Sequence, residues 1–107
     1  MAGATSSVIT LEFHGALADR FAALGNRRGT RTRIAVTLDS PQSVANLLRC
    51  LAEEDQRYTH LFDVATGTLP EHVEAVLNDR VLDLQGGMQA QLQAGDVLAF
   101  LPAHAGG

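Results

Sequence analysis

The feature that most constrains the fold is a single amphipathic stripe near the middle of the chain. Apolar residues recur there at the i, i+3, i+4 and i+7 positions of a helix: Val44, Leu47, Leu48 and Leu51. Two start signals precede the stripe, because Ser40 can cap a helix that begins at Pro41, and Ser43 can cap it directly. A helix that is apolar on one face only needs a second layer to cover that face.

Alternating apolar residues on both sides of this helix predict that the second layer is a sheet. Strands are predicted for residues 8–13, 34–38, 73–77 and 81–84. Asn78-Asp79 predicts a tight turn between the last two, and Gly95-Asp96 predicts another turn. Residues 97–101, Val-Leu-Ala-Phe-Leu, form a nearly continuous apolar run, which is typical of a central strand covered on both faces.

Two less regular segments join these elements. Residues 16–24 have the spacing of a short amphipathic helix, and Gly25-Asn26 predicts its end as a left-handed cap. Residues 56–70 predict a mixed connector, because Gly67 and Pro70 disfavour a long regular element there. The apolar residues of this connector are expected in the core: Leu61, Phe62 and Val64.

One helix packed across a mixed sheet of four to five strands is an α+β arrangement, and this element order predicts a β-grasp, ubiquitin-like fold. We expect a flexible leader at residues 1–7, a single domain at residues 8–101 and an extended tail at residues 102–107. In this arrangement the last strand pairs beside the first, and the chain then leaves the sheet toward solvent.

Composition excludes several classes of protein. A hydrophobic content of 46% argues against a disordered chain, and no apolar run approaches the roughly 20 residues that span a bilayer. The net charge of −4 argues against nucleic acid or an anionic membrane as the main partner. A single cysteine excludes an intramolecular disulfide, and the four histidines lack metal-site spacing. We expect a cytoplasmic protein without a bound metal.

The basic residues are all arginine, and four of them fall within seven positions: Arg27, Arg28, Arg31 and Arg33. This arginine cluster is interpreted either as a solvated loop or as a docking patch for an acidic partner. Cys50 lies at the edge of the apolar stripe of the central helix, where we interpret it as a small residue that fills space.

The last third of the chain carries a specific resemblance. Residues 76–81 read Val-Leu-Asn-Asp-Arg-Val, and residues 92–102 read Leu-Gln-Ala-Gly-Asp-Val-Leu-Ala-Phe-Leu-Pro. A strand that ends in an Asn-containing turn, a Gly-Asp step, an apolar strand, a proline and a terminal Gly106-Gly107 together resemble the MoaD/ThiS family of ubiquitin-like sulfur carrier proteins.

The resemblance implies a carrier and not an enzyme, in the manner of the small subunit of molybdopterin synthase. Gly107 and Gly106 would form the reactive terminus, which is adenylated and then converted to a thiocarboxylate. The residues that would present it are Pro102, Ala103, His104 and Ala105, and those that would dock the partner are Arg27, Arg28, Arg31 and Phe100.

The implied partners supply all of the catalysis. They are an adenylating enzyme of the ubiquitin-activating type, a sulfur donor of the cysteine desulfurase or rhodanese type, and the large subunit of an acceptor synthase. ATP and the sulfur donor are used by these partners, and no cofactor is expected on this chain. No Gly-rich phosphate loop precedes a helix, which agrees with that expectation.

Elementary chemistry gives an independent reason for the two glycines. A terminal carboxyl group has a pKa of about 3.5, so at neutral pH it is an anion and a poor electrophile until it is adenylated. The activating enzyme must bring the terminal carbon to ATP through a narrow channel. Glycine has no Cβ and adopts extended or positive-φ conformations freely, so it suits such a channel.

Two other functions remain open at this stage. The chain could be a protein modifier that is conjugated through Gly107, although it has no lysine on which to build side-chain-linked polymers of itself. It could also be a binding subunit whose tail is never activated. The receiving pathway also stays open among molybdopterin, thiamin, sulfur amino acid, tRNA thiolation and secondary-metabolite routes.

Overall fold

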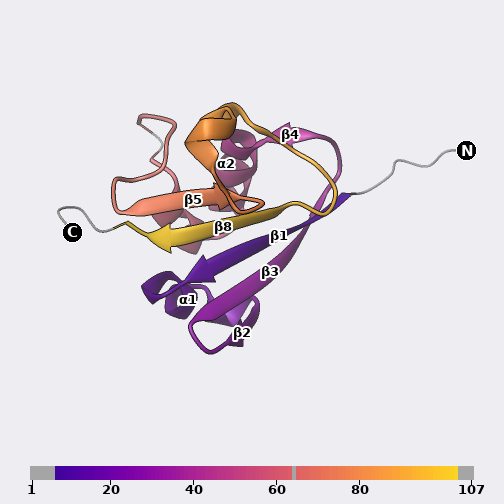
Figure 1. Ribbon diagram of the computed structural model, residues 1–107. Coiled ribbons are helices and arrows are strands. Elements are labelled where there is room, and N and C mark those ends of the chain that lie inside the picture. Colours follow the sequence, from indigo (N-terminus) through magenta and orange to yellow (C-terminus); the bar gives the residue numbers. More distant parts are fainter. Residues whose placement is uncertain (1–6, 64, 104–107) are drawn as a thin grey trace, which may run out of the picture.

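A computed structural model describes residues 7–63 and 65–103 of the chain. One mixed sheet with a helix across one face forms the body of the molecule (Figure 1). The sheet order is β2-β3-β1-β8-β5-β6. Its strands are β1 (Ser7–His14), β2 (Asn26–Arg28), β3 (Arg31–Leu38), β5 (Val73–Leu77), β6 (Arg80–Val81) and β8 (Val97–Pro102). The predicted β-grasp fold is confirmed, with six strands in place of the four to five expected.

The last strand occupies a central place in the sheet, as the sequence predicted. Strand β8 pairs in parallel with β1 and antiparallel with β5. Strand β1 pairs antiparallel with β3 on its other side. Because β1 and β8 run in the same direction, the end of β8 lies beside the end of β1 (Figure 1).

The predicted central helix is α2 (Val44–Glu54), and all four residues of its apolar stripe are buried. Ser43, not Ser40, caps it, because the Ser43 hydroxyl accepts a hydrogen bond of 3.1 Å from the backbone N–H of Asn46. A side chain oxygen at this position satisfies one of the free N–H groups of the first turn. Cys50 is exposed, so its interpretation as a space-filling residue was wrong.

Stacked aromatic rings join the short helix α1 (Ala16–Arg20) and the segment after it to the sheet. The ring centroid of Phe13 lies 4.1 Å from that of Phe21 and 5.3 Å from that of Phe100. Phe21 in turn lies 5.2 Å from Tyr58. This stack, packed between α1, the sheet and the connector, forms the end of the core nearest the end of β8.

The remaining elements are short. They are the 3-10 helices η1 (Ala22–Leu24), η2 (Gln56–Leu61), η3 (Leu82–Gln85) and η4 (Gly87–Gln89), and the two-stranded sheet of β4 (Gln42–Ser43) and β7 (Gln91–Leu92). Leu61 and Phe62 are buried, as predicted, while Val64 lies outside the described residues. The predicted return strand at 81–84 is shorter than expected, since η3 replaces most of it.

Two local predictions near the arginine cluster were wrong. Gly25 is extended, with a φ of −150°, and is not a left-handed cap. It is required for space, because a Cβ there would lie 2.3 Å from the backbone oxygen of Arg33. The predicted loop is a hairpin of β2 and β3, in which Arg28 pairs with Arg31.

The first and last strands extend slightly beyond their predicted bounds. Strand β1 begins at Ser7, and β8 runs through Pro102. Residues 1–6 of the predicted leader lie outside the described residues. Within the described part of the chain, no helix is both long enough and apolar enough to cross a membrane.

Candidate functional site at the start of the tail

The start of β8 is held by side chains from two turns. Asn78 and Asp79 have φ values of 50° and 68°, which the two central residues of a tight hairpin turn require. The Asn78 side chain accepts a hydrogen bond of 2.9 Å from the N–H of Val97 and donates one of 2.9 Å to Asp96. The Asn-containing turn and the Gly-Asp step therefore meet in space and fix where β8 begins.

The end of β8 is held by backbone contacts. Pro102 lies opposite Val73 of β5, beyond the last residue of β8 that pairs with β1. Proline has no N–H to donate, and this end position of the strand does not require one. The N–H of Ala103 donates a hydrogen bond of 2.8 Å to the backbone oxygen of His72. The sheet thus fixes the chain as far as Ala103.

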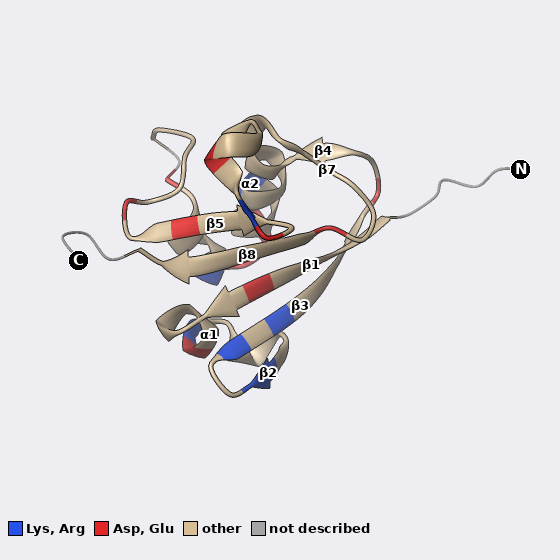
Figure 2. Cartoon of the chain, in the orientation of Figure 1, with Lys and Arg blue, Asp and Glu red and all other residues tan. Residues whose placement is uncertain are grey.

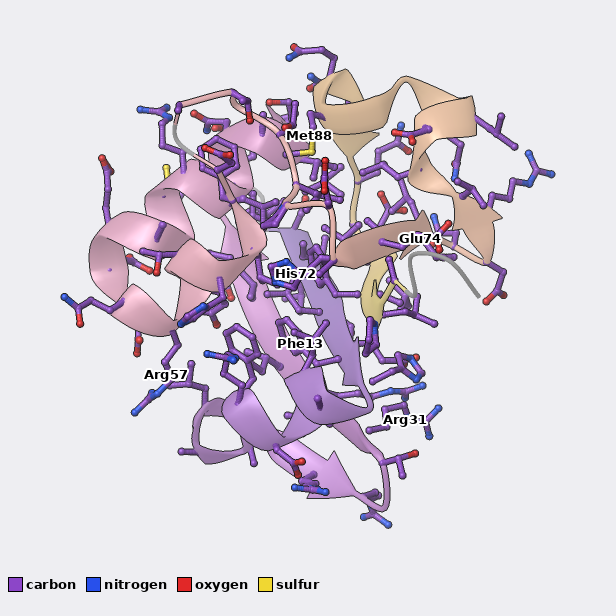
Figure 3. The ribbon with its side chains drawn as sticks, turned by 90° about the vertical axis from the view of Figure 1, so that its left-hand side faces the viewer. Phe13, Arg31, Arg57, His72, Glu74 and Met88 are labelled. Atoms are coloured by element: carbon purple, nitrogen blue, oxygen red, sulfur yellow. The ribbon has the colours of Figure 1, made fainter. Side chains whose placement is uncertain are left out.

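A cavity of about 240 Å³ lies beside this point of departure. It is lined by Ala16, Leu17, Arg20, His60, His72, Pro102 and Ala103. Arg20 comes from α1, His60 from η2, and His72 from the segment before β5. Figure 3 shows His72 at this end of the molecule, near the middle of the view. No spacing in the sequence signals this grouping, because the fold alone brings the three side chains together.

The predicted presenting residues divide between the described and undescribed parts of the chain. Pro102 and Ala103 lie at the start of the tail and are partly buried. His104, Ala105, Gly106 and Gly107 lie outside the described residues. Among residues 7–63 and 65–103, no group of three or more histidine, cysteine or acidic side chains is arranged to hold a metal ion.

The predicted docking residues do not form one surface. Phe100 is 0% exposed and stacks on Phe13, so its prediction as a docking residue was wrong. An aromatic residue in an apolar strand is as consistent with a core contact as with a surface contact, and only the pairing of β8 decides between them. Arg27, Arg28 and Arg31 are exposed on the hairpin of β2 and β3.

A carboxylate that the sequence did not single out lies beside these arginines. Glu12 of β1 is almost buried, and its Oε2 accepts a hydrogen bond of 2.8 Å from Nε of Arg33. Its Oε1 lies 2.7 Å from Nε2 of His14. Burial by itself raises the pKa of Glu12, but the hydrogen bonds and charges of His14 and Arg33 outweigh burial and lower that pKa below its ordinary value.

Comparison with protein families decides the identity of the domain. The model of the ThiS family matches residues 21–107, which include β8, the start of the tail and the terminal Gly106-Gly107. The chain belongs to the ThiS family. It is therefore a ubiquitin-like protein of the carrier or modifier type and not a catalyst. A comparison with curated proteins finds no match.

Solved structures agree with the ThiS family fold. The HVO 2177 protein of Haloferax volcanii has a TM-score of 0.72 at 23% identity, over 95% of this chain and 88% of its own. The small archaeal modifier protein 1 of Methanosarcina acetivorans has a TM-score of 0.70 at 14% identity, over 96% and 99%. A chain of the BexX/CysO complex of Amycolatopsis orientalis has a TM-score of 0.63 at 19% identity, over 92% and 99%.

Proposed function

We propose that this ThiS family protein is a cytoplasmic sulfur carrier whose terminal Gly106-Gly107 is activated by a partner enzyme. The observation that carries the proposal is the family match through Gly107, joined to a central strand that delivers the chain to the edge of the domain at Ala103. The folded domain is the rigid surface against which the partner enzyme docks, and Gly107 supplies the reactive carbon.

The proposed chemistry has three steps, and all of them occur on partner enzymes. A carboxylate oxygen of Gly107 attacks the α-phosphorus of ATP, pyrophosphate leaves, and an acyl adenylate forms. Sulfur from a persulfide of the donor enzyme then attacks the acyl carbon, and AMP leaves with the electron pair of the carbon–oxygen bond. A second thiol cleaves the sulfur–sulfur bond and leaves a thiocarboxylate on Gly107.

The structure supports this chemistry because the sheet already holds the backbone in place as far as Ala103, where the tail begins. Four residues follow Ala103, and four extended residues reach at most about 14 Å. The activating enzyme must therefore dock against the domain near the end of β8 while it holds the tail. Because the chain is already fixed as far as Ala103, its backbone loses little entropy up to that residue when the tail is bound.

The proposed partners follow from the chemistry. They are an adenylating enzyme of the ubiquitin-activating type, a sulfur donor of the cysteine desulfurase or rhodanese type, and an acceptor synthase that takes the sulfur in cofactor or metabolite biosynthesis. A large subunit of the molybdopterin-synthase type is the acceptor we propose first.

Intact-mass measurement tests the proposal directly. The 107-residue chain is incubated with the adenylating enzyme of the same genome, ATP and a sulfur donor, and we expect the mass gain of one oxygen replaced by sulfur. Cys50 is exposed and could carry a persulfide, which would add a whole sulfur atom and be removed by a reductant. Cys50→Ser is therefore the control, and it should still gain the thiocarboxylate. The same gain after deletion of Gly106-Gly107 would refute the proposal.

A modifier role is the second candidate, because one of the similar structures is a small archaeal modifier protein. In that role a lysine amine of a target protein attacks the adenylate in place of sulfur. An affinity-tagged chain purified from its own cells would then be recovered in larger species that resist denaturant and thiols. Recovery of the unconjugated chain alone would favour the carrier.

A further inference from the structure

The pairing of strands sorts the arginine cluster onto two faces of the sheet. On β1, Ile9, Leu11 and Phe13 are buried in the core, so the residues that alternate with them project from the opposite face, which we call the outer face. Residues paired directly in antiparallel strands project from the same face. Arg31 pairs with His14 of β1, and Arg33 pairs with Glu12. Arg31 and Arg33 therefore both project from the outer face.

Arg28 joins them from the edge strand, because it pairs with Arg31. We call Arg28, Arg31 and Arg33 the arginine row. Arg27 projects from the other face, where it forms an ion pair with Asp19 of α1. Figure 2 shows the basic positions of β2 and β3 grouped at one side of the sheet, next to the acidic position on β1.

Two of the three members of the arginine row form no ion pair within the described part of the chain. Arg33 is paired with Glu12 but keeps 54% of its side chain exposed. In the described part of the chain, neither Arg28 nor Arg31 forms an ion pair with an acidic side chain. The two arginines also lie directly opposite each other. Like charges at directly opposite positions destabilise a strand pair. Asn26 and the three arginines also line a shallow hollow of about 150 Å³ that contains no acidic side chain.

The arginine row lies at the end of the sheet from which the tail departs. Phe13 of β1 is level with Phe100 of β8, and the next residue, His14, pairs with Arg31. Strands β3 and β8 are separated by β1 alone, which corresponds to about 10 Å between their backbones. In Figure 3, Arg31 and Glu74 lie on the side of the sheet away from α2. A protein that binds the tail therefore lies close to the arginine row as well.

We propose that the arginine row binds an acidic segment of the partner protein that receives the tail. A row of guanidinium groups favours carboxylates, each of which can accept two hydrogen bonds from one arginine. The whole chain has a net charge of −4 even with these arginines included, which disfavours nucleic acid because the rest of the surface would repel its phosphates. The identity of the partner rests on the proposed function, whereas the acidic preference of the row rests on the structure alone.

The first experiment tests the acidic preference without any enzyme. Hexaglutamate is titrated into the full chain at low salt, with hexaglutamine as the neutral probe, and amide shifts are followed by NMR. We expect shifts confined to residues 26–33 and their neighbours on β1, which weaken with salt and disappear in Arg28→Gln/Arg31→Gln. Arg49→Gln/Arg57→Gln removes the same charge from exposed sites elsewhere and should keep them. Equal shifts with hexaglutamine, or shifts elsewhere, would overturn the proposal.

The second experiment measures adenylation by the partner enzyme as a function of the concentration of this chain. We expect the KM of Arg28→Gln/Arg31→Gln to rise about tenfold with kcat nearly unchanged, because docking and not chemistry is weakened. Arg28→Lys/Arg31→Lys keeps the charge but not the paired hydrogen bonds of the guanidinium groups, and it should recover part of the loss. An unchanged KM overturns the proposal. In the titration of the first experiment, tighter binding of polyuridylate, a nucleic acid probe, than of hexaglutamate would also overturn it. Absence of adenylation in the unmodified chain contradicts the proposed function instead, and the hexaglutamate result then stands on its own.

Discussion

Gly15, which follows the first strand, lies against Pro102, which ends the last one. Gly15 has a φ of 61°, and a Cβ built on it would lie 3.3 Å from Cγ of Pro102. A side chain at this position is therefore opposed twice, once by the backbone conformation and once by the proline ring. This contact ties the turn before α1 to the start of the tail.

We expect Gly15→Ala to lower the free energy of unfolding by about 2 kcal/mol, as measured by urea denaturation. Gly29→Ala is the matched control, because Gly29 also has a positive φ of 60°, but a Cβ added there would meet no atom within 4 Å. The control should lose only about 1 kcal/mol. Pro102→Ala should recover part of the loss in Gly15→Ala. Equal losses at the two glycines, unaffected by Pro102→Ala, would contradict a role for the contact.

The side-chain hydrogen bonds of Asn78 should be a large local contribution to stability. Asn78→Ala removes the bond accepted from Val97 and the bond donated to Asp96, and it leaves a residue with a poorer preference for positive φ. We expect a loss of about 2 kcal/mol in the free energy of unfolding. Glu53→Ala, at an exposed position of α2, should change it little. If Asn78→Ala lowers the free energy of unfolding no more than Glu53→Ala does, the turn holds its shape without the Asn78 side chain.

Glu12 should make stability depend on pH. Its pKa is lowered in the folded protein, so its ionised form stabilises the fold above the unfolded pKa, and this stabilisation is lost as the pH falls through the folded pKa. We expect Glu12→Gln to cost about 1 kcal/mol near neutral pH, with the difference shrinking below about pH 4. Thermal unfolding from pH 3 to pH 7 measures this difference. A destabilisation that stays the same over this pH range would contradict the role given to the Glu12 carboxylate.

Phe100 should act on stability and not on docking. Phe100→Ala removes a fully buried ring from the stack with Phe13, and we expect a loss of about 3 to 5 kcal/mol in the free energy of unfolding. Leu101→Ala, at the next and partly exposed position, should cost about 1 kcal/mol or less. Phe100→Leu keeps most of the buried volume and should leave the KM for the adenylating enzyme unchanged. A raised KM in that variant would restore Phe100 as a docking residue.

Local sequence patterns determined the elements and the family of this protein. The stripe of α2, the alternation of β1 and β3 and the apolar run of β8 follow from periodicities of 3.6 and 2, which are properties of neighbouring residues. The order of these elements predicted one helix across a mixed sheet. The turn residues and the terminal Gly106-Gly107 indicated the family in the same way, because the conformation of a turn and the reactivity of a terminus both depend on the types of neighbouring residues.

Only the tertiary structure decided how distant residues share a surface. Strand register placed Arg28 and Arg31 together on the outer face and sent Arg27 to the opposite face. The fold as a whole also buried Phe100 and brought His60 and His72 into one cavity beside the tail. These outcomes depend on which strands pair and at what offset, and a shift of one residue would reverse every face. That information lies in contacts between segments far apart in the chain, which no local pattern contains.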